Sequence, residues 1–324
     1  MLRLQPFELL FPKDLTEAVS LAASYKEDAK LCAGGTDLIP NMKHELHEPK
    51  VVIHLARVRN LGGITESADG VSIGAMTTLS EVASHPVMLK YCPSLASAAV
   101  HVAGPQLRNM GTIGGNICLD TRCLFYNQTY FWREAIGFCL KKCGDTCHVT
   151  QTGKRCVAAA SNDTATALLC LDAVVEIAGP QGTREMSLDS FYVANGEKNT
   201  VLQPDEILTR VMIPKTRLAK QGFAKLRNRE AIDFPMLSIA FRCDLSESGE
   251  IQRAKLAVNA LAAKPKVMNL DFMIGRTPSL ELAEQVGEFA KARCMPLINI
   301  SDDPLWRKDM VAVYVKRLFA TQLA

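Results

Sequence analysis

Six of the eleven cysteines in this 324-residue chain lie between positions 118 and 156, and this clustering constrains the fold more than any other feature. A segment of that length cannot bury a hydrophobic core of its own, but thiolates that hold a metal ion or an iron–sulfur cluster can order it. The clustered residues are Cys118, Cys123, Cys139, Cys143, Cys147 and Cys156. We therefore expect a metal or cluster centre in this segment, and buried structural cysteines are the alternative.

The overall composition is that of an ordinary globular protein. Hydrophobic residues make up 48% of the chain and charged residues 22%, and the net charge is +3. Charge alone therefore indicates neither nucleic acid nor a membrane surface as a partner. No apolar leader or bilayer-spanning run is evident. We expect a soluble, cytoplasmic protein of two or three domains that needs no disulfides to fold.

The first part of the chain is predicted to form one helix followed by a small β-loop-α-β unit. Asp14, with Glu17 three residues later, has the spacing of a capping box and predicts a helix start. A strand is predicted over 29–32, a helix over 38–46 and a second strand over 51–53.

The rest of the chain is predicted to mix helices and strands. Two strands flank the Asp69–Gly70 turn, Thr78 caps a helix, and Leu168–Ile177 is a candidate buried strand. We place a domain boundary at Pro214–Thr216. The pattern beyond it predicts a long hairpin over 238–260 and amphipathic helices over 280–292 and 305–321.

Two loops contain adjacent glycines, Gly34-Gly35 and Gly114-Gly115. Adjacent glycines let successive backbone N–H groups converge on an anion, so each loop is able to cradle a phosphate. A tight turn between a strand and a helix is the alternative for either loop alone. Neither loop fits the G-x-G-x-x-G or the G-x-x-x-x-G-K-[ST] pattern, which argues against a Rossmann or P-loop fold.

Together, the two loops resemble the FAD-pyrophosphate loops of the flavin module in the xanthine dehydrogenase family. The matching residues are Ala33-Gly34-Gly35-Thr36-Asp37-Leu38 and Thr112-Ile113-Gly114-Gly115-Asn116. Three further stretches match in order, so the resemblance covers nearly the whole chain. They are Ser161-Asn162-Asp163, Phe223-Ala224-Lys225-Leu226 with Arg229 and Asp233 following, and Asp303-Pro304-Leu305-Trp306-Arg307-Lys308.

This resemblance implies an α+β fold. A two-subdomain FAD-binding module of the xanthine dehydrogenase flavoprotein (PCMH/VAO-like) type would precede a domain with an antiparallel sheet and helices. The subdomains would span 1–56 and 57–216, with an iron–sulfur insert at about 119–157. The C-terminal domain would span 217–324 and would be similar to that of carbon monoxide dehydrogenase flavoproteins.

The resemblance also implies which residues contact FAD. The first loop would line the pyrophosphate and the second would face it, with Ile113 near the flavin ring. Lys225 would stabilise negative charge on a reduced flavin. Val102, Asp163, Leu208 and Lys225 stand where relatives place adenosine-side or ring-side contacts, and a core or surface role is the alternative for each. The implied set is Leu31, Ala33, Gly34, Gly35, Thr36, Asp37, Leu38, Val102, Thr112, Ile113, Gly114, Gly115, Asn116, Asp163, Leu208 and Lys225.

The cysteine segment is an insertion relative to most members of that family, which connect the second glycine loop to the Asp163 region much more directly. Such an insert resembles that of 4-hydroxybenzoyl-CoA reductases, whose flavin-binding β subunit carries a [4Fe–4S] cluster there. Cys118 stands where relatives carry small or apolar residues, so we exclude it. The predicted ligands are Cys123, Cys139, Cys147 and Cys156, with Cys143 as the alternative to one of them.

Zinc is the competing interpretation of this segment. Thiolates and an imidazole at short spacings would make a Cys₃His site. It would use Cys139, Cys143, Cys147 and His148, and would leave Cys123 and Cys156 without a role.

The chain contains no recognisable molybdopterin site and no C-x₄-C-x₂-C loop for a [2Fe–2S] cluster. The resemblance therefore implies an oxidoreductase subunit that relays electrons between a ferredoxin-like donor, its [4Fe–4S] cluster and FAD. Partner subunits with [2Fe–2S] and molybdopterin would complete a dimer of heterotrimers. The implied reaction removes the phenolic hydroxyl of 4-hydroxybenzoyl-CoA reductively, giving benzoyl-CoA, in anaerobic aromatic degradation. The alternatives are the flavin subunit of an oxidative xanthine or carbon monoxide dehydrogenase-type hydroxylase, and a FAD-binding subunit with a zinc-stabilised insert.

Overall fold

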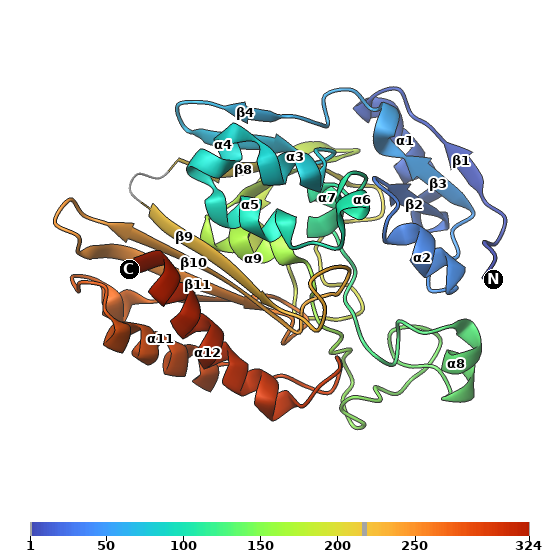
Figure 1. The fold of residues 1–324 in the computed structure, drawn as a ribbon. Coiled ribbons are helices and arrows are strands. Elements are labelled where there is room, and N and C mark those ends of the chain that lie inside the picture. The colour runs from blue at the N-terminus through green and yellow to red at the C-terminus, as the bar shows by residue number, and fades with distance from the viewer. Residues whose placement is uncertain (1, 216–218, 324) are drawn as a thin grey trace.

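Three sheets organise the chain in the computed structural model, which describes residues 2–215 and 219–323. They have three, five and four strands, in the orders β1-β3-β2, β4-β5-β8-β6-β7 and β12-β11-β10-β9. Figure 1 shows them as three successive parts of the chain, with a separate loop segment around α8 below the first part. No helix among the described residues is both long and apolar enough to cross a bilayer.

The first sheet is parallel and contains the two strands of the predicted β-loop-α-β unit. Strands β1 and β2 both pair with β3 in parallel register. The predicted cap is confirmed, because the Asp14 side chain accepts a hydrogen bond of 2.9 Å from the Glu17 backbone N–H. Helix α2 ends at Lys43, three residues earlier than predicted. The elements are β1 (Glu8–Leu10), α1 (Leu15–Tyr25), β2 (Ala29–Cys32), α2 (Leu38–Lys43) and β3 (Val51–His54), with single 3-10 turns at Lys26–Asp28 and Leu55–Arg57.

The second sheet is antiparallel throughout and is covered by short helices. Thr78 caps α3 as predicted, since its hydroxyl accepts from the Glu81 N–H at 3.2 Å. Its strands are β4 (Ile64–Glu66), β5 (Gly70–Gly74), β6 (Val174–Gly179), β7 (Gly182–Ser187) and β8 (Ile207–Pro214). Its helices are α3 (Leu79–Ser84), α4 (Pro86–Tyr91), α5 (Pro93–Val100), α6 (Pro105–Arg108), α7 (Ile113–Ile117), α9 (Asp163–Cys170) and α10 (Leu188–Phe191).

The prediction of a strand over Leu168–Ile177 is wrong in its first half. Leu168 to Cys170 form the end of helix α9, and the strand begins only at Val174. Every residue of α9 is buried, including Asp163, Thr164 and Thr166. The helix therefore has no exposed face to give its sequence the periodicity that distinguishes a helix from a buried strand.

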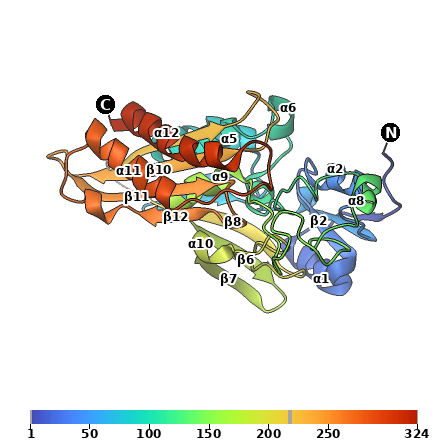
Figure 2. The same cartoon turned by 90° about the horizontal axis from the view of Figure 1, so that it is seen from below.

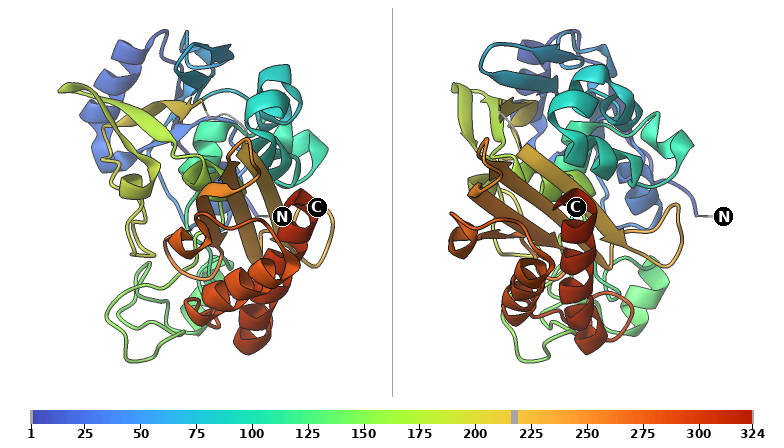
Figure 3. Two further views of the ribbon diagram at one scale, coloured as in Figure 1. Left: turned by 90° about the vertical axis from the view of Figure 1, so that its left-hand side faces the viewer. Right: turned by 60° about the vertical axis from the view of Figure 1, so that its left-hand side comes forward.

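The third sheet is an antiparallel meander between two helical layers. Figure 1 shows α5 and α9 on one side of it and α11 and α12 on the other, and the contacts between these elements agree. The two views in Figure 3 show the strands of the same sheet in brown and orange, with α11 and α12 beside them. The predicted boundary residue Thr216 lies outside the described residues, and β8 and β9 on either side of it belong to different sheets. The elements are β9 (Ala219–Leu226), β10 (Leu237–Leu245), β11 (Ile251–Asn259), β12 (Lys266–Asn269), a 3-10 turn (Asp271–Met273), α11 (Leu280–Ala292) and α12 (Pro304–Leu323).

The cysteine insert, residues 119–157, contains one short helix, α8 (Tyr130–Ala135), and lies against the first part of the chain (Figure 1 and Figure 2). The Arg133 guanidinium donates to the backbone carbonyls of His44 and Glu45, at 2.9 and 3.1 Å. Buried Leu46 packs with Tyr126 of the insert. The insert is therefore fastened to the turn that follows α2.

Candidate functional site

The two glycine loops lie against one another. A Cβ atom on Gly34 would overlap the backbone carbonyl of Met110, just before the second loop, so that position admits only glycine. Gly35 has a φ of +69°, which also favours glycine. A Cβ on Gly115 would come 3.8 Å from that of Ala33. The structure therefore brings together the two loops that the sequence paired.

The second loop opens α7 with its backbone donors largely engaged. Thr112 Oγ1 accepts from the Gly115 N–H at 3.1 Å, and the Gly114 N–H donates to the Ala75 carbonyl at 2.9 Å. Gly115 is exposed, whereas Thr112 and Gly114 are buried. Gly115 is thus the point of this loop that a ligand between the loops would meet.

Several predicted FAD contacts lie behind the loops rather than between them. Ile113 and Leu208 are both buried in the core of the second subdomain. Asn116 Oδ1 accepts from the Thr164 N–H at 3.2 Å and from the Thr164 hydroxyl at 2.5 Å, so this side chain is turned toward α9. Leu31 and Leu38, in β2 and at the start of α2, are half-buried.

A buried ion pair joins two of the remaining predicted contacts. Lys225 Nζ lies 2.6 Å from Asp163 Oδ2, and the side chains are 1% and 3% exposed. The lysine also donates to the His101 carbonyl at 3.0 Å, which places the pair beside Val102. Burial raises the pKa of the Asp163 carboxyl, and the Lys225 charge opposes that rise. Within the described residues, Asp163 Oδ1 has no hydrogen-bond partner, so a ligand N–H group would satisfy it.

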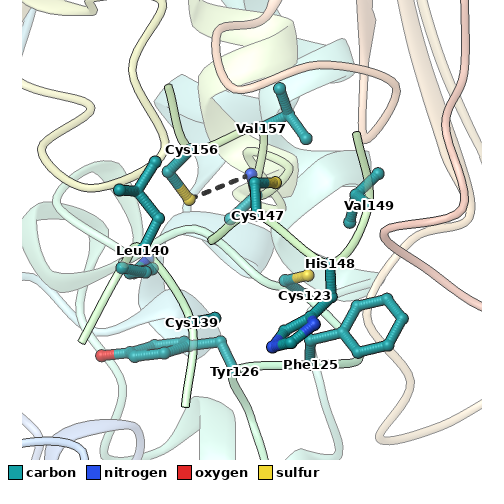
Figure 4. A pocket seen from close by; sticks show the side chains of 12 residues that line it. Cys123, Phe125, Tyr126, Cys139, Leu140, Cys147, His148, Val149, Cys156 and Val157 are labelled. Carbon is teal, nitrogen blue, oxygen red and sulfur yellow. Dashed lines mark hydrogen bonds between the residues drawn. The ribbon is translucent and has the colours of Figure 1, made fainter. Parts of the chain in front are cut away.

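The four predicted thiols line one pocket. Figure 4 shows Cys123, Cys139, Cys147 and Cys156 around this space, with Phe125, Tyr126 and His148 beside them. Cys143 is exposed and does not line the pocket. Cys118 packs against the core of the second subdomain instead.

Tight turns in the insert aim the thiols at the pocket. The Lys142 and Gly144 N–H groups both donate to the Cys139 carbonyl, at 2.9 and 3.1 Å. This turn gives Cys143 a positive φ of 65°. At the end of the insert, the Ala158 N–H donates to Cys156 Sγ at 3.5 Å, the dashed line in Figure 4.

The thiols are in an apolar setting that favours the protonated form unless a positive centre binds them. Burial raises the pKa of Cys123 to about 12, and it also raises the pKa of Cys156. Burial acts in the same direction at Cys147, but hydrogen bonds from Thr150 and from neighbouring backbone N–H groups bring its pKa below the ordinary value. Four convergent thiols in a largely apolar pocket fit an iron–sulfur cluster.

The zinc set is not brought together. Cys143 lies outside the pocket, and His148 Nε2 is hydrogen-bonded to the Phe138 carbonyl. Among residues 2–215 and 219–323, no three His, Cys, Asp or Glu side chains converge as the ligands of a single metal ion. The ligands of a four-iron cluster bind separate iron atoms, so they stand farther apart than the ligands of one ion.

The sequence did not identify two residues that connect these sites, Arg122 and Asp120. Arg122 of the insert forms an ion pair with Asp37 of the first glycine loop. Asp120 is an ion-pair partner of Lys141, which lines the thiol pocket. Arg122 stands next to Cys123, and Asp120 follows α7 in the sequence. The ion pairs that they form across the fold cannot be predicted from this spacing.

Comparison with known proteins identifies the class. Residues 5–216 match the family described as the FAD binding domain in molybdopterin dehydrogenase, and residues 222–322 match the CO dehydrogenase flavoprotein C-terminal domain. The FAD-binding subunit PaoB of an Escherichia coli aldehyde oxidoreductase is 32% identical over 259 residues, 76% of this chain and 79% of that protein. The nicotinate dehydrogenase FAD-subunit of Eubacterium barkeri is 24% identical over 98% of this chain and 96% of its own length.

A solved structure has the same fold along the whole chain. A carbon monoxide dehydrogenase from Hydrogenophaga pseudoflava, which lacks the Mo-pyranopterin moiety, matches with a TM-score of 0.80 and 25% identity, over 99% of this chain and 100% of that one. The chain is thus an oxidoreductase subunit of the molybdenum hydroxylase class. It belongs to the family of FAD-binding subunits of xanthine and carbon monoxide dehydrogenases. The predicted α+β fold with an antiparallel C-terminal domain is confirmed.

Proposed function

We propose that this chain is the FAD- and [4Fe–4S]-carrying electron-transfer subunit of a molybdenum enzyme. The observation that carries the proposal is the convergence of Cys123, Cys139, Cys147 and Cys156 on one pocket, while Cys143 is exposed. A single insert thereby offers the four thiolates that a cube of iron and sulfide requires. The family relationship supports the flavin.

The glycine loops and the Asp163–Lys225 pair would hold FAD. Gly34 keeps side-chain atoms out of the contact between the loops, and Asp163 Oδ1, which has no hydrogen-bond partner among the described residues, offers an acceptor to a ligand N–H. Bound FAD would supply one- and two-electron transfer. The proposed contact set is the one implied by the resemblance, with Leu31, Val102, Ile113 and Leu208 as its apolar members.

The proposed enzyme is a 4-hydroxybenzoyl-CoA reductase, in which this subunit passes electrons from a ferredoxin-like donor toward the molybdenum subunit. The cysteine insert supports this assignment, because the resemblance ties it to such reductases. The relatives are named as subunits or as a medium chain, which agrees with a complex that has molybdenum and [2Fe–2S] partners. A dimer of such heterotrimers in the cytoplasm is the proposed assembly.

A second candidate is the flavin subunit of an oxidative hydroxylase, in which electrons leave through FAD. It is favoured by the named relatives, which include nicotinate dehydrogenase and aldehyde oxidoreductase subunits. This alternative gives the thiol pocket no required role.

The first experiment is metal and cofactor analysis of the isolated full-length chain, purified without oxygen. We expect about four irons, four sulfides and one FAD per chain, and a broad visible band that dithionite bleaches. One zinc and no iron would reject the cluster. The complete complex is then assayed with reduced ferredoxin and 4-hydroxybenzoyl-CoA. If the chain contains iron but the complex forms no benzoyl-CoA, the proposed role in electron transfer would stand and the reductase assignment would be overturned.

A further inference from the structure

We propose that Lys141 and Asp120 set the reduction potential of the cluster held in the thiol pocket. Lys141 raises the potential, and Asp120 limits the rise as its counter-charge. The inference rests on the proposed [4Fe–4S] site and concerns how this chain tunes it.

Lys141 is a buried cation at the pocket. It lines the same space as the four thiols, and its side chain is only 3% exposed. Its ammonium lies 4.4 Å from the centre of the Tyr126 ring, which also lines the pocket. It donates to Asp120 Oδ1 at 2.7 Å, to the Thr121 carbonyl at 3.0 Å and to the Thr121 hydroxyl. These contacts hold the charge in place where water cannot screen it.

Asp120 is the counter-charge of Lys141. It does not line the pocket, and its side chain is 24% exposed, so solvent weakens its field more than that of the lysine. An electron added to the cluster increases its negative charge. The cation therefore stabilises the reduced form more than the carboxylate destabilises it, since cluster potentials follow the local charge.

Two neighbouring basic side chains, Lys142 and His47, do not share this position. Lys142 Nζ donates to the carbonyls of Glu45 and Leu46 and pairs with Glu48 at 2.7 Å, and it does not line the pocket. His47 lies 3.9 Å from Asp120, but burial lowers its pKa to about 4, so it is neutral at pH 7. Lys142 therefore provides a matched control, one residue away in the same turn.

The test is a redox titration of the holoenzyme complex, with the reduced cluster followed by electron paramagnetic resonance. We expect Lys141→Met to shift the midpoint to more negative values and Asp120→Asn to more positive values. A tenfold change in the reduction equilibrium would be about 59 mV for one electron. Lys142→Met and the charge-preserving Lys141→Arg should stay close to the unmodified enzyme.

Iron, sulfide and FAD contents are measured in every variant. Shifts of Lys141→Met and Asp120→Asn in the same direction, or no shift in either, with four irons retained, would overturn the inference. If Lys141→Met loses iron, the comparison of Asp120→Asn with Lys141→Arg decides, because only a charge effect moves the first and spares the second. Absence of iron from the unmodified chain would instead reject the proposed function.

Discussion

Arg122 and Asp37 form an ion pair that joins the cysteine insert to the first glycine loop. Arg122 immediately precedes Cys123 of the thiol pocket, and its guanidinium also lies 4.2 Å from the Phe234 ring centre. Asp37 is the last residue before α2. The proposed flavin and cluster sites are therefore connected by a direct contact between side chains.

This contact predicts that the two cofactors stabilise each other's sites. Arg122→Met should weaken FAD binding about tenfold, because Asp37 loses the partner that holds its loop and a partly buried carboxylate is left unpaired. FAD release, followed by fluorescence, measures the effect. Arg155→Met, at an exposed position in the same insert, is the control. Additive effects of Arg122→Met and Asp37→Asn in a double-mutant cycle would contradict the coupling.

The pocket geometry predicts which cysteines are ligands. Serine at any of the four pocket positions should remove the cluster from most of the protein, since a four-iron cube needs all four thiolates. Cys143→Ser and Cys118→Ser should keep full iron content. Iron and sulfide per chain, with the visible spectrum, give the measurement. Iron loss in Cys143→Ser with retention in Cys139→Ser would show that the ligand set is wrong. The four pocket variants are Cys123→Ser, Cys139→Ser, Cys147→Ser and Cys156→Ser.

The contact between the glycine loops predicts a strict requirement at Gly34. Gly34→Ala should lower the free energy of unfolding by about 1–3 kcal/mol and abolish FAD retention, because its methyl group would overlap the Met110 carbonyl. Urea unfolding and bound-flavin absorbance test both effects. Gly62→Ala is the matched control, since no atom lies within 4 Å of an added Cβ there. Equal behaviour of the two variants would refute the loop contact.

The Asp163–Lys225 pair predicts a pH-dependent defect. Lys225→Met should lower the free energy of unfolding by about 3–5 kcal/mol at pH 7, because it leaves the Asp163 charge buried and unpaired. Burial raises the pKa of Asp163 in the folded state, so protonation of this carboxyl favours folding. The loss in free energy of unfolding should therefore shrink as the pH falls toward 4. Urea unfolding of Lys225→Met and of Lys225→Met with Asp163→Asn measures this. A defect that is independent of pH, or that persists in the double variant, would argue against an electrostatic cause.

Local sequence signals predicted much of the fold. The caps at Asp14 and Thr78 and the hairpin of β10 and β11 depend on residues close in sequence, and each formed as predicted. The four cysteines selected from the sequence line one pocket, and their role as cluster ligands stays a prediction. Helix α9 was misread because burial on all sides erases periodicity.

The connections between the glycine loops and the thiol pocket could not be predicted from the sequence. The Arg122–Asp37 pair spans 85 positions, and the Lys141–Asp120 pair depends on how the insert folds back on the exit from α7. Both are decided by packing between segments rather than by local pattern. Lys141 and Lys142 have the same side chain, yet only the first lines the pocket.

Asn299 fastens the two ends of the insert to the C-terminal domain. Its carbonyl accepts from the Leu124 N–H at 2.9 Å, and its side chain donates to the Val157 carbonyl at 2.6 Å. Asn299 lies 142 positions after Val157 in the sequence, so we expect the thiols to reach their final positions only after Asn299 has been synthesised. Nascent chains that end before Asn299 should therefore take up no iron.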